Sequence, residues 1–274
     1  MKFRAALAIG LLAALIIVAV AVRERTPLRS EYCVAEVGDT RARVDLEQAQ
    51  WASLMSAIGQ TRGLPPRATT IAIATAFQES KVRNIDYGDR DSVGLFQQRP
   101  SQGWGTPEQI MDPHFAIAAF YDGLEQVDGY ESMEITDAAQ EVQRSAYPKA
   151  YAQHEPYARA LASSLRGFSP GAFTCQVNPA GGGSFDAVRS DLEAAFGESD
   201  VRTENSSLTV APAGDDDEMR SASGWAYAHY LVANAGHLRL ASVAFDGRQW
   251  TAEDSVDGWV EHEPATDEVV VTLS

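Results

Sequence analysis

The feature that most constrains the fold of this chain is an unbroken apolar run near its N-terminus, from Ala5 to Val22, with basic residues on both sides. As a helix rising about 1.5 Å per residue, the run would span roughly 27 Å, close to the ~30 Å hydrocarbon core of a bilayer. We therefore expect residues 1–25 to form an N-terminal transmembrane helix that serves as a signal anchor. A cleaved signal peptide is the alternative, with Ala19-Val20-Ala21 as a weak cleavage site.

On either interpretation the remaining chain lies outside the cytoplasm, as part of a cell-membrane protein with extracytoplasmic domains or as a secreted protein. Cys33 and Cys175 are the two cysteines of the chain. An even number of cysteines outside the cytoplasm favours a disulfide. The bond would tie together the ends of the region between them and, in the chain-entropy model, stabilise it by on the order of 4–5 kcal/mol. Two buried thiols are the alternative.

The chain has 274 residues and a formal net charge of −16 at pH 7. Because an acidic chain gains nothing from phosphate attraction, we expect no nucleic-acid partner. The histidines show no metal-ligand spacing, so we expect no metal and no other cofactor. The acidic run Asp215–Glu218 is interpreted as a solvated loop rather than a cation site.

The pattern along the chain divides it into segments of different character. After the anchor, residues 26–44 are polar and irregular and predict a stalk. Helical periodicity dominates residues 45–176, where strand signals are nearly absent. The Gly-rich residues 177–184 predict a flexible linker, and residues 185–274 predict a small α+β accessory domain. The clearest helices are expected at 66–81, 107–122, 136–144, 149–166, 185–196 and 224–235, and strands at 238–245, 248–252 and 268–273.

Glu79 ends the helix predicted over residues 66–81, which is apolar on most sides and therefore expected to be buried. At that position the helix dipole and the loss of solvent both disfavour the carboxylate anion. A carboxylic acid with a raised pKa can donate a proton to the oxygen of a glycosidic bond. The alternative, for such a residue taken alone, is a solvated surface glutamate.

The segment that follows Glu79 supplies groups suited to a sugar. The turn from Ser92 to Gln98 offers backbone and side-chain amides that match sugar hydroxyl and acetamido groups, and Ser80 can orient the Glu79 carboxyl group by a hydrogen bond. Aromatic ring faces suit sugar stacking. The residues expected to bind substrate are Ser80, Gly94, Phe96, Gln97, Gln98 and Trp104, with Tyr87 and Tyr121 as further aromatic candidates.

Three short stretches are similar to motifs of lytic transglycosylases. Glu79-Ser80 matches the Glu-Ser motif, Gly94-Leu95-Phe96-Gln97 matches Gly-Leu-x-Gln, and the segment holding Tyr147 resembles the late Ala-Tyr motif. Residues 84–113 and 138–151 more closely resemble actinobacterial secreted or anchored proteins of lysozyme-like fold. The resemblance covers about residues 31–176. It implies a mostly α lysozyme-like domain, followed here by the small α+β domain and preceded by the transmembrane helix. It also adds Tyr147 to the substrate-binding candidates.

The resemblance also implies an activity. In lytic transglycosylases a single Glu, here Glu79, cleaves peptidoglycan between N-acetylmuramic acid and N-acetylglucosamine and leaves a 1,6-anhydro end. A second carboxylate from Asp86, Asp89 or Asp91 would instead permit hydrolysis by a muramidase-type glycosidase; turn-forming acids are the alternative for these three.

One departure from the family pattern supports a different function. Tyr147 is followed by Pro148, whereas the family has a Tyr-Asn pair at this point. The departure favours the alternative of a non-catalytic cell-wall-binding or scaffold protein with a degenerate cleft. The expected partners on both interpretations are peptidoglycan and, through the N-terminal helix, the membrane.

Overall fold

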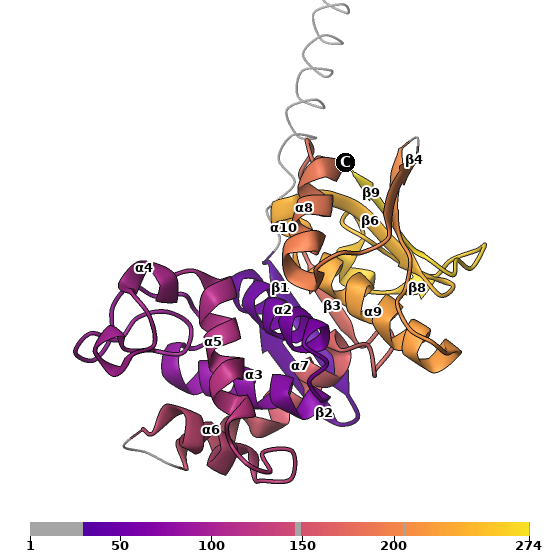
Figure 1. Ribbon diagram of the computed structural model, residues 1–274. Coiled ribbons are helices and arrows are strands. Elements are labelled where there is room, and N and C mark those ends of the chain that lie inside the picture. The colour runs from indigo at the N-terminus through magenta and orange to yellow at the C-terminus, as the bar shows by residue number, and fades with distance from the viewer. Residues whose placement is uncertain (1–29, 146–148, 205, 274) are drawn as a thin grey trace, which may run out of the picture. The chain divides into compact units, whose positions relative to one another are not determined.

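The computed structural model describes residues 30–145, 149–204 and 206–273 of the chain (Figure 1). Residues 31–274 group as one unit and residues 1–30 as another, and the following description concerns the first of these. The predicted anchor at residues 1–25 and the candidate Tyr147 lie outside the described residues.

The first part of this unit is built from helices around α3 (Pro66–Ser80). Pro66 occupies the first turn of α3, where a missing N–H costs nothing. Ile71 and Ile73 are completely buried, because α2, α5, α6 and α7 surround α3. The surrounding elements are α2 (Leu46–Thr61), α4 (Pro107–Ile110), α5 (Pro113–Glu125), α6 (Ile135–Gln143), α7 (Glu155–Leu165) and the short 3₁₀ helices η1 (Pro100–Gln102) and η2 (Ala150–His154).

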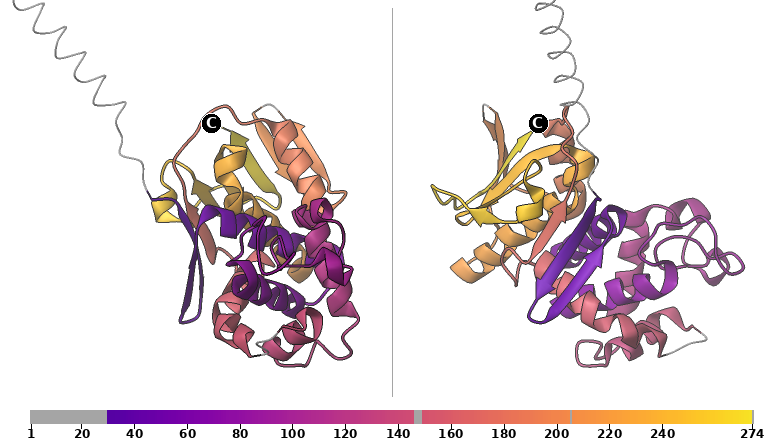
Figure 2. Two further views of the ribbon diagram at one scale, coloured as in Figure 1. Left: turned by 90° about the vertical axis from the view of Figure 1, so that its left-hand side faces the viewer. Right: turned by 180° about the vertical axis from the view of Figure 1, so that it is seen from behind.

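A three-stranded antiparallel sheet lies against these helices. Its strands are β1 (Tyr32–Val37), β2 (Thr40–Val44) and β3 (Phe173–Gln176), in the order β2-β1-β3. Both views of Figure 2 show the β1–β2 hairpin beside the helices, and α7 packs on both of its strands. Cys33 of β1 stands opposite Cys175 of β3, and the two form the expected disulfide. A disulfide is typical of proteins outside the cytoplasm, as predicted for this chain.

The second part of the unit pairs helices with a larger sheet. Its elements are α8 (Phe185–Phe196), β4 (Val201–Glu204), β5 (Ser207–Val210), α9 (Asp217–Ala233), α10 (Ala235–Leu238), β6 (Leu240–Phe245), β7 (Arg248–Thr251), η3 (Ser255–Asp257), β8 (Val260–Glu261) and β9 (Val269–Leu273). The strand order is β4-β5-β9-β6-β7-β8, with every pair antiparallel. Helix α9 packs on β6 and β9 and buries Trp225 completely.

Hydrogen bonds that are buried or part-buried join the two parts along a seam. The imidazole Nδ1 of His229 in α9 lies 2.7 Å from the carbonyl oxygen of Ser164 in α7. The indole N–H of Trp250 donates to the carbonyl oxygen of Cys175 at 2.9 Å, and that of Trp259 donates to Phe173 at 2.8 Å. Strand β3 therefore belongs to the small sheet while its carbonyl oxygens bind the C-terminal part.

The prediction of a mostly α lysozyme-like fold is wrong, and the predicted N-terminal transmembrane helix falls on residues outside those that the structure describes. The described residues hold two sheets as well as helices, and residues 32–44, predicted as an irregular stalk, form the β1–β2 hairpin. The strands are short, and the pairing of β1 with β3 joins segments far apart in the sequence, so local periodicity does not reveal it. Among the described residues, no helix is long and apolar enough to cross a membrane.

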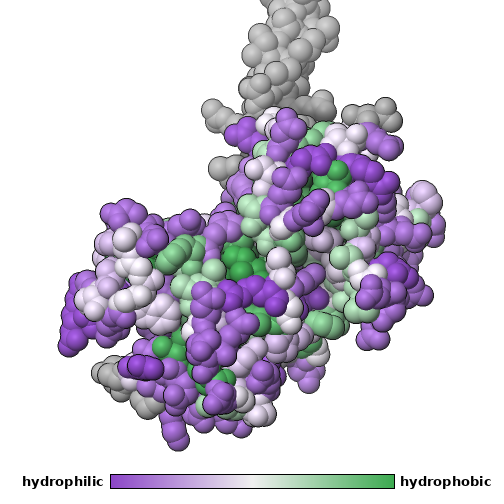
Figure 3. Space-filling view, viewed as in Figure 1, coloured by the Kyte–Doolittle hydropathy of each residue, from purple (hydrophilic) through white to green (hydrophobic). Residues whose placement is uncertain are grey.

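The face of the molecule in Figure 3 is largely hydrophilic, with smaller apolar areas between the polar ones. Among the described residues, a few large hydrophobic side chains are strongly exposed: Tyr87, Tyr157, Phe168, Met219, Val256 and Val260. Single exposed apolar residues of this kind are ordinary. Phe168, Met219 and Val256 each line a cavity.

Candidate functional site

Glu79 lies in the last turn of α3, with its side chain half-buried. The hydroxyl group of Tyr151, in η2, donates a hydrogen bond to Glu79 Oε1 at 2.7 Å. Burial raises the pKa of the Glu79 carboxyl group, and hydrogen bonds from Tyr151 and Gln143 oppose that shift without cancelling it. The carboxyl group is therefore held in one place and biased toward its protonated form, as a general acid requires.

Side chains from two other segments bind this carboxyl group. Tyr151 comes from η2 and Gln143 from the last turn of α6. The side-chain amide of Gln143 also donates to the carbonyl oxygen of Phe96 at 2.6 Å. The turn that follows Gly94 is thereby joined to the same site as Glu79, although the two lie on separate elements.

Ser80 does not orient the Glu79 carboxyl group as expected. Its buried hydroxyl donates to the carbonyl oxygen of Leu95 at 2.7 Å and accepts from the backbone N–H of Arg83 at 3.1 Å. Ser80 therefore fastens the turn at Gly94–Gln97 to the end of α3. Ser80 therefore contributes to the site indirectly: it holds the turn next to Glu79 and does not bind the Glu79 carboxyl group.

The turn itself is held by its own side chains. Gly94 has φ of +80°, and a Cβ added there would lie 2.8 Å from the carbonyl oxygen of Ile110, so only glycine fits. The Gln97 side chain accepts from the Ser92 hydroxyl at 3.0 Å and donates to the Gly94 carbonyl oxygen at 3.3 Å. Gln98 is buried and donates to the carbonyl oxygen of Ala116 at 3.1 Å. The Gln97 amide thus acts within the loop, and the Gln98 amide joins the loop to α5.

The aromatic candidates occupy different environments. Phe96 is completely buried and stacks on Phe120 with ring centroids 4.4 Å apart. Tyr121 is also completely buried. Trp104 is half-buried and packs near Gly123 of α5, whereas Tyr87 is 69% exposed. Of these four rings, only Trp104 and Tyr87 have a surface that a sugar can reach.

The aspartates considered as a second carboxylate do not share one role. Asp91 accepts hydrogen bonds from the backbone N–H of Ser101 at 2.8 Å and from Arg99 Nε at 2.7 Å. These bonds, led by those from Ser101, hold the pKa of Asp91 well below its usual range. Asp86 and Asp89 are exposed on the loop. Asp91 thus stabilises the loop as an anion, whereas burial raises the pKa of the Glu79 carboxyl group.

Tyr151 and Gln143 belong to the site, although no motif in the sequence predicts either of them. Both lie in or next to the 138–151 stretch that carries the resemblance, but Tyr147 was chosen from it because of its motif. Another missed pair is Gln78 and His154: their side chains are 3.2 Å apart (Oε1 to Nε2), and the His154 ring stacks on Phe77. The adjacency of Gln78 to Glu79 was the available signal for that pair.

The described residues contain no group of three or more His, Cys, Asp and Glu side chains able to hold a metal ion. A cavity of about 710 Å³ is not lined by Glu79 and lies elsewhere on α3 and α7. Comparison with known protein families finds no match to this chain, and a search of curated proteins finds none either.

Proposed function

We propose that the protein cleaves the glycan strands of peptidoglycan between N-acetylmuramic acid and N-acetylglucosamine, with Glu79 as its catalytic acid and base. The observation that carries the proposal is the half-buried Glu79 carboxyl group held by the Tyr151 hydroxyl at 2.7 Å. The disulfide supports a location outside the cytoplasm, where this substrate lies. The similarity of the Glu-Ser and Gly-Leu-x-Gln stretches to lytic transglycosylase motifs supplies the substrate class.

In the proposed reaction Glu79 gives its proton to the glycosidic oxygen while the bond from that oxygen to C1 of muramic acid breaks. The resulting carboxylate then takes the proton of the muramic acid 6-hydroxyl as that oxygen bonds to C1. The products are a 1,6-anhydro end and a free hydroxyl on the departing sugar, and Glu79 is protonated again. No water is consumed, so one carboxyl group serves as acid and then as base.

The surroundings of the aspartates support this single-acid route over hydrolysis. A two-carboxylate glycosidase places its second carboxylate about 5–9 Å from the first, across the scissile bond. Asp91 is engaged by Arg99 and Ser101, and Asp86 and Asp89 are exposed on the loop. Transglycosylation needs only the Glu79 carboxyl group, whereas hydrolysis would need a second carboxylate across the scissile bond.

Digestion of purified peptidoglycan, followed by mass spectrometry of the released fragments, tests the proposal. We expect fragments ending in anhydro-muramic acid from the native protein, and their release should be about 10³-fold slower from Glu79→Gln. Glu141→Gln, an exposed acid on the neighbouring α6, is the matched control and should leave release unchanged. Reducing ends would show hydrolysis instead, and full activity of Glu79→Gln would exclude Glu79 as the acid.

A second candidate is a wall-binding protein without catalysis. It is favoured by one observation: the Gln97 and Gln98 amides are hydrogen-bonded inside the protein, so the turn offers fewer free groups to a sugar. Sedimentation of the protein with insoluble peptidoglycan, without release of any fragment, would support this function over cleavage.

A further inference from the structure

A cavity of about 710 Å³ lies toward the end of α3 opposite Glu79. Arg67, in the first turn of α3, lines it, and at about 1.5 Å per residue this position is roughly 18 Å along the helix from Glu79. The other walls come from α7, from η2, from the β1–β2 hairpin and from the loop after α7 that carries Phe168. Its volume is in the range of sites that bind small organic molecules.

The walls combine apolar surface with a few polar groups. The apolar lining residues are Val37, Pro66, Ala152, Pro156, Ala160, Ala162 and Phe168, and the hydroxyl-bearing ones are Thr40, Thr70 and Ser163. Phe168 is 55% exposed and is one of the few strongly exposed large apolar side chains described. An apolar concavity with few convergent polar groups is the usual form of a small-molecule site.

The charge of the lining is opposite to that of the chain. Arg67 and Arg159 line the cavity together with one acid, Glu155, whereas the whole chain has a net charge of −16. Arg159 Nε donates to Glu155 Oε1 at 2.8 Å, so this pair is largely neutral and Arg67 is the cation in excess.

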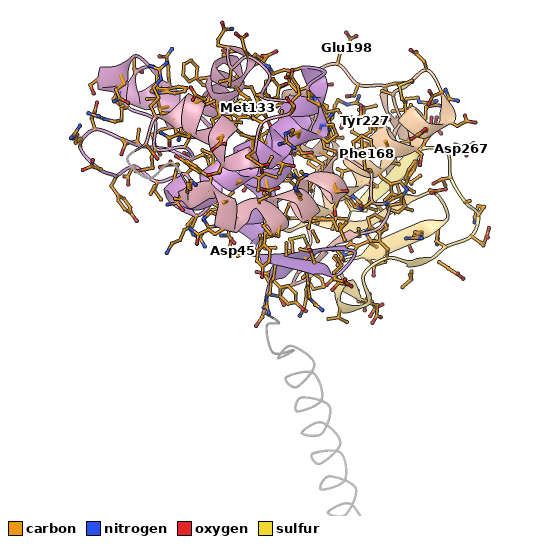
Figure 4. The ribbon with its side chains drawn as sticks, turned by 90° about the horizontal axis from the view of Figure 1, so that it is seen from below. Asp45, Met133, Phe168, Glu198, Tyr227 and Asp267 are labelled. Carbon is orange, nitrogen blue, oxygen red and sulfur yellow. A yellow bond between two sulfur atoms is a disulfide. The ribbon has the colours of Figure 1, made fainter. Side chains whose placement is uncertain are left out.

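Arg67 is held in place from one side. Its Nη2 donates to the carbonyl oxygen of Met133, and its Nε is buried with no hydrogen-bond partner among the described residues. Met133, and Phe168 of the cavity wall, are both labelled in Figure 4. A guanidinium group is a planar cation with several N–H donors, and a cation beside apolar walls is suited to a carboxylate or sulfonate.

We propose that this cavity binds an organic anion with an apolar body, the acidic group toward Arg67 and Arg159 and the apolar body against Phe168 and Val37. The site is separate from Glu79 and does not depend on glycan cleavage. Glu155 competes with the ligand for Arg159, so its charge weakens binding.

Fluorescence titration with 8-anilinonaphthalene-1-sulfonate tests the proposal on the native protein. N-phenyl-1-naphthylamine, which has the same rings without the sulfonate, is the matched neutral probe and should bind at least tenfold more weakly, the factor of about 1.4 kcal/mol expected for one charge-assisted contact. Laurate should displace the sulfonate, and dodecanol should not. Equal binding of the charged and neutral probes, or equal competition by laurate and dodecanol, would overturn the proposal.

Variants locate the binding to this cavity. Arg67→Gln with Arg159→Gln should weaken sulfonate binding, and Glu155→Gln should tighten it. Arg220→Gln, which breaks a comparable ion pair on α9 (with Asp217), is the control and should change nothing. Ala152→Trp, an exposed position on the lining, should block the cavity without altering the core.

Thermal unfolding of each variant separates loss of binding from loss of folding. If the folded double arginine variant and the folded Ala152→Trp variant both bind the sulfonate like the native protein, the cavity is not the site. If Glu155→Gln weakens binding, the assigned role of the charge is wrong.

Discussion

The region around Glu79 and the seam around His229 both bury a titratable group, but to different degrees. Glu79 is half-buried and accepts a hydrogen bond from Tyr151. His229 is completely buried: its Nδ1 bonds the Ser164 carbonyl oxygen, and its Nε2 has no hydrogen-bond partner among the described residues. Both environments favour the uncharged form, so the pKa of Glu79 is raised, and burial lowers the pKa of His229 to about 4.

The two regions differ in whether a bound molecule can reach the titratable group. A half-buried acid can exchange its proton with a bound molecule, so the shifted pKa of Glu79 can serve chemistry. His229 is enclosed by Trp225, Phe173 and Trp259, so its shifted pKa affects only the stability of the seam. Burial alone therefore does not identify a functional group, and the predictions below separate the two roles.

The largest effect is expected from the disulfide, which holds β3 in the small sheet while β3 also bonds the seam. Replacing Cys33 and Cys175 by serine should lower the free energy of unfolding by about 4–5 kcal/mol, the loop-closure entropy of the region that they enclose. Urea unfolding of the native and double-variant proteins measures it. A loss below about 1 kcal/mol would mean that the seam hydrogen bonds from Trp250 and Trp259 hold β3 without the disulfide.

Glu79→Gln should reduce the rate of glycan cleavage by about 10³-fold, the usual range for removing a general acid. The same change should not lower the free energy of unfolding, because it replaces a half-buried carboxylate by a neutral amide of similar shape. Initial rates of fragment release and urea unfolding, run on the same preparation, check both parts. A destabilised variant would mean that Glu79 has a structural role as well.

The free energy of unfolding should fall as the pH is lowered, because His229 is buried in its uncharged form. His229 has a pKa of about 4 in the folded protein against 6.5 for the free side chain. Unfolding therefore takes up a proton between these values: the stability is fully present above pH 6.5 and is lost as the pH falls toward 4, by roughly 3 kcal/mol. Besides burial, the charge of Arg248 lowers this pKa, while the Ser164 carbonyl oxygen opposes the shift.

Unfolding measured at several pH values tests this, with His229→Asn as the variant, because asparagine keeps a donor near the Nδ1 position and does not titrate. Its stability should be lower at neutral pH and should depend less on pH. Glu79 has the opposite effect on the pH dependence of stability. Its raised pKa stabilises the folded state at low pH, and this stabilisation is lost as the pH rises through the pKa of Glu79 in the folded protein. An unchanged acid slope in His229→Asn would remove His229 as the cause.

The smallest effect is expected at Tyr151. Tyr151→Phe removes a hydrogen bond that lowers the pKa of Glu79, so that pKa should rise further and the alkaline limb of the activity profile should move to higher pH. The rate at the optimum should fall by about tenfold through lost positioning, about 1.4 kcal/mol. Tyr157→Phe, an exposed tyrosine on α7, is the control. A lower rate without a shifted limb would show that Tyr151 positions Glu79 without tuning its acidity.

Several features of the site followed from local sequence patterns. The helix predicted over 66–81 is α3 at Pro66–Ser80, because a proline start and an apolar interior are both local signals. The helix predicted over 107–122 is instead divided into α4 and α5, with Asp112 capping the second. The disulfide was predicted from the cysteine count and the inferred compartment.

The sequence by itself thus determined that an acid ends a buried helix and that two distant cysteines pair. Only the tertiary structure decided that Tyr151 binds Glu79, that Ser80 fastens the turn at Leu95, and that β3 completes the sheet with β1. Helix starts and ends depend on neighbouring residues, so they can be read from local patterns. Contacts between residues far apart, such as Glu79 with Tyr151, depend on how the elements pack, and no local pattern records that.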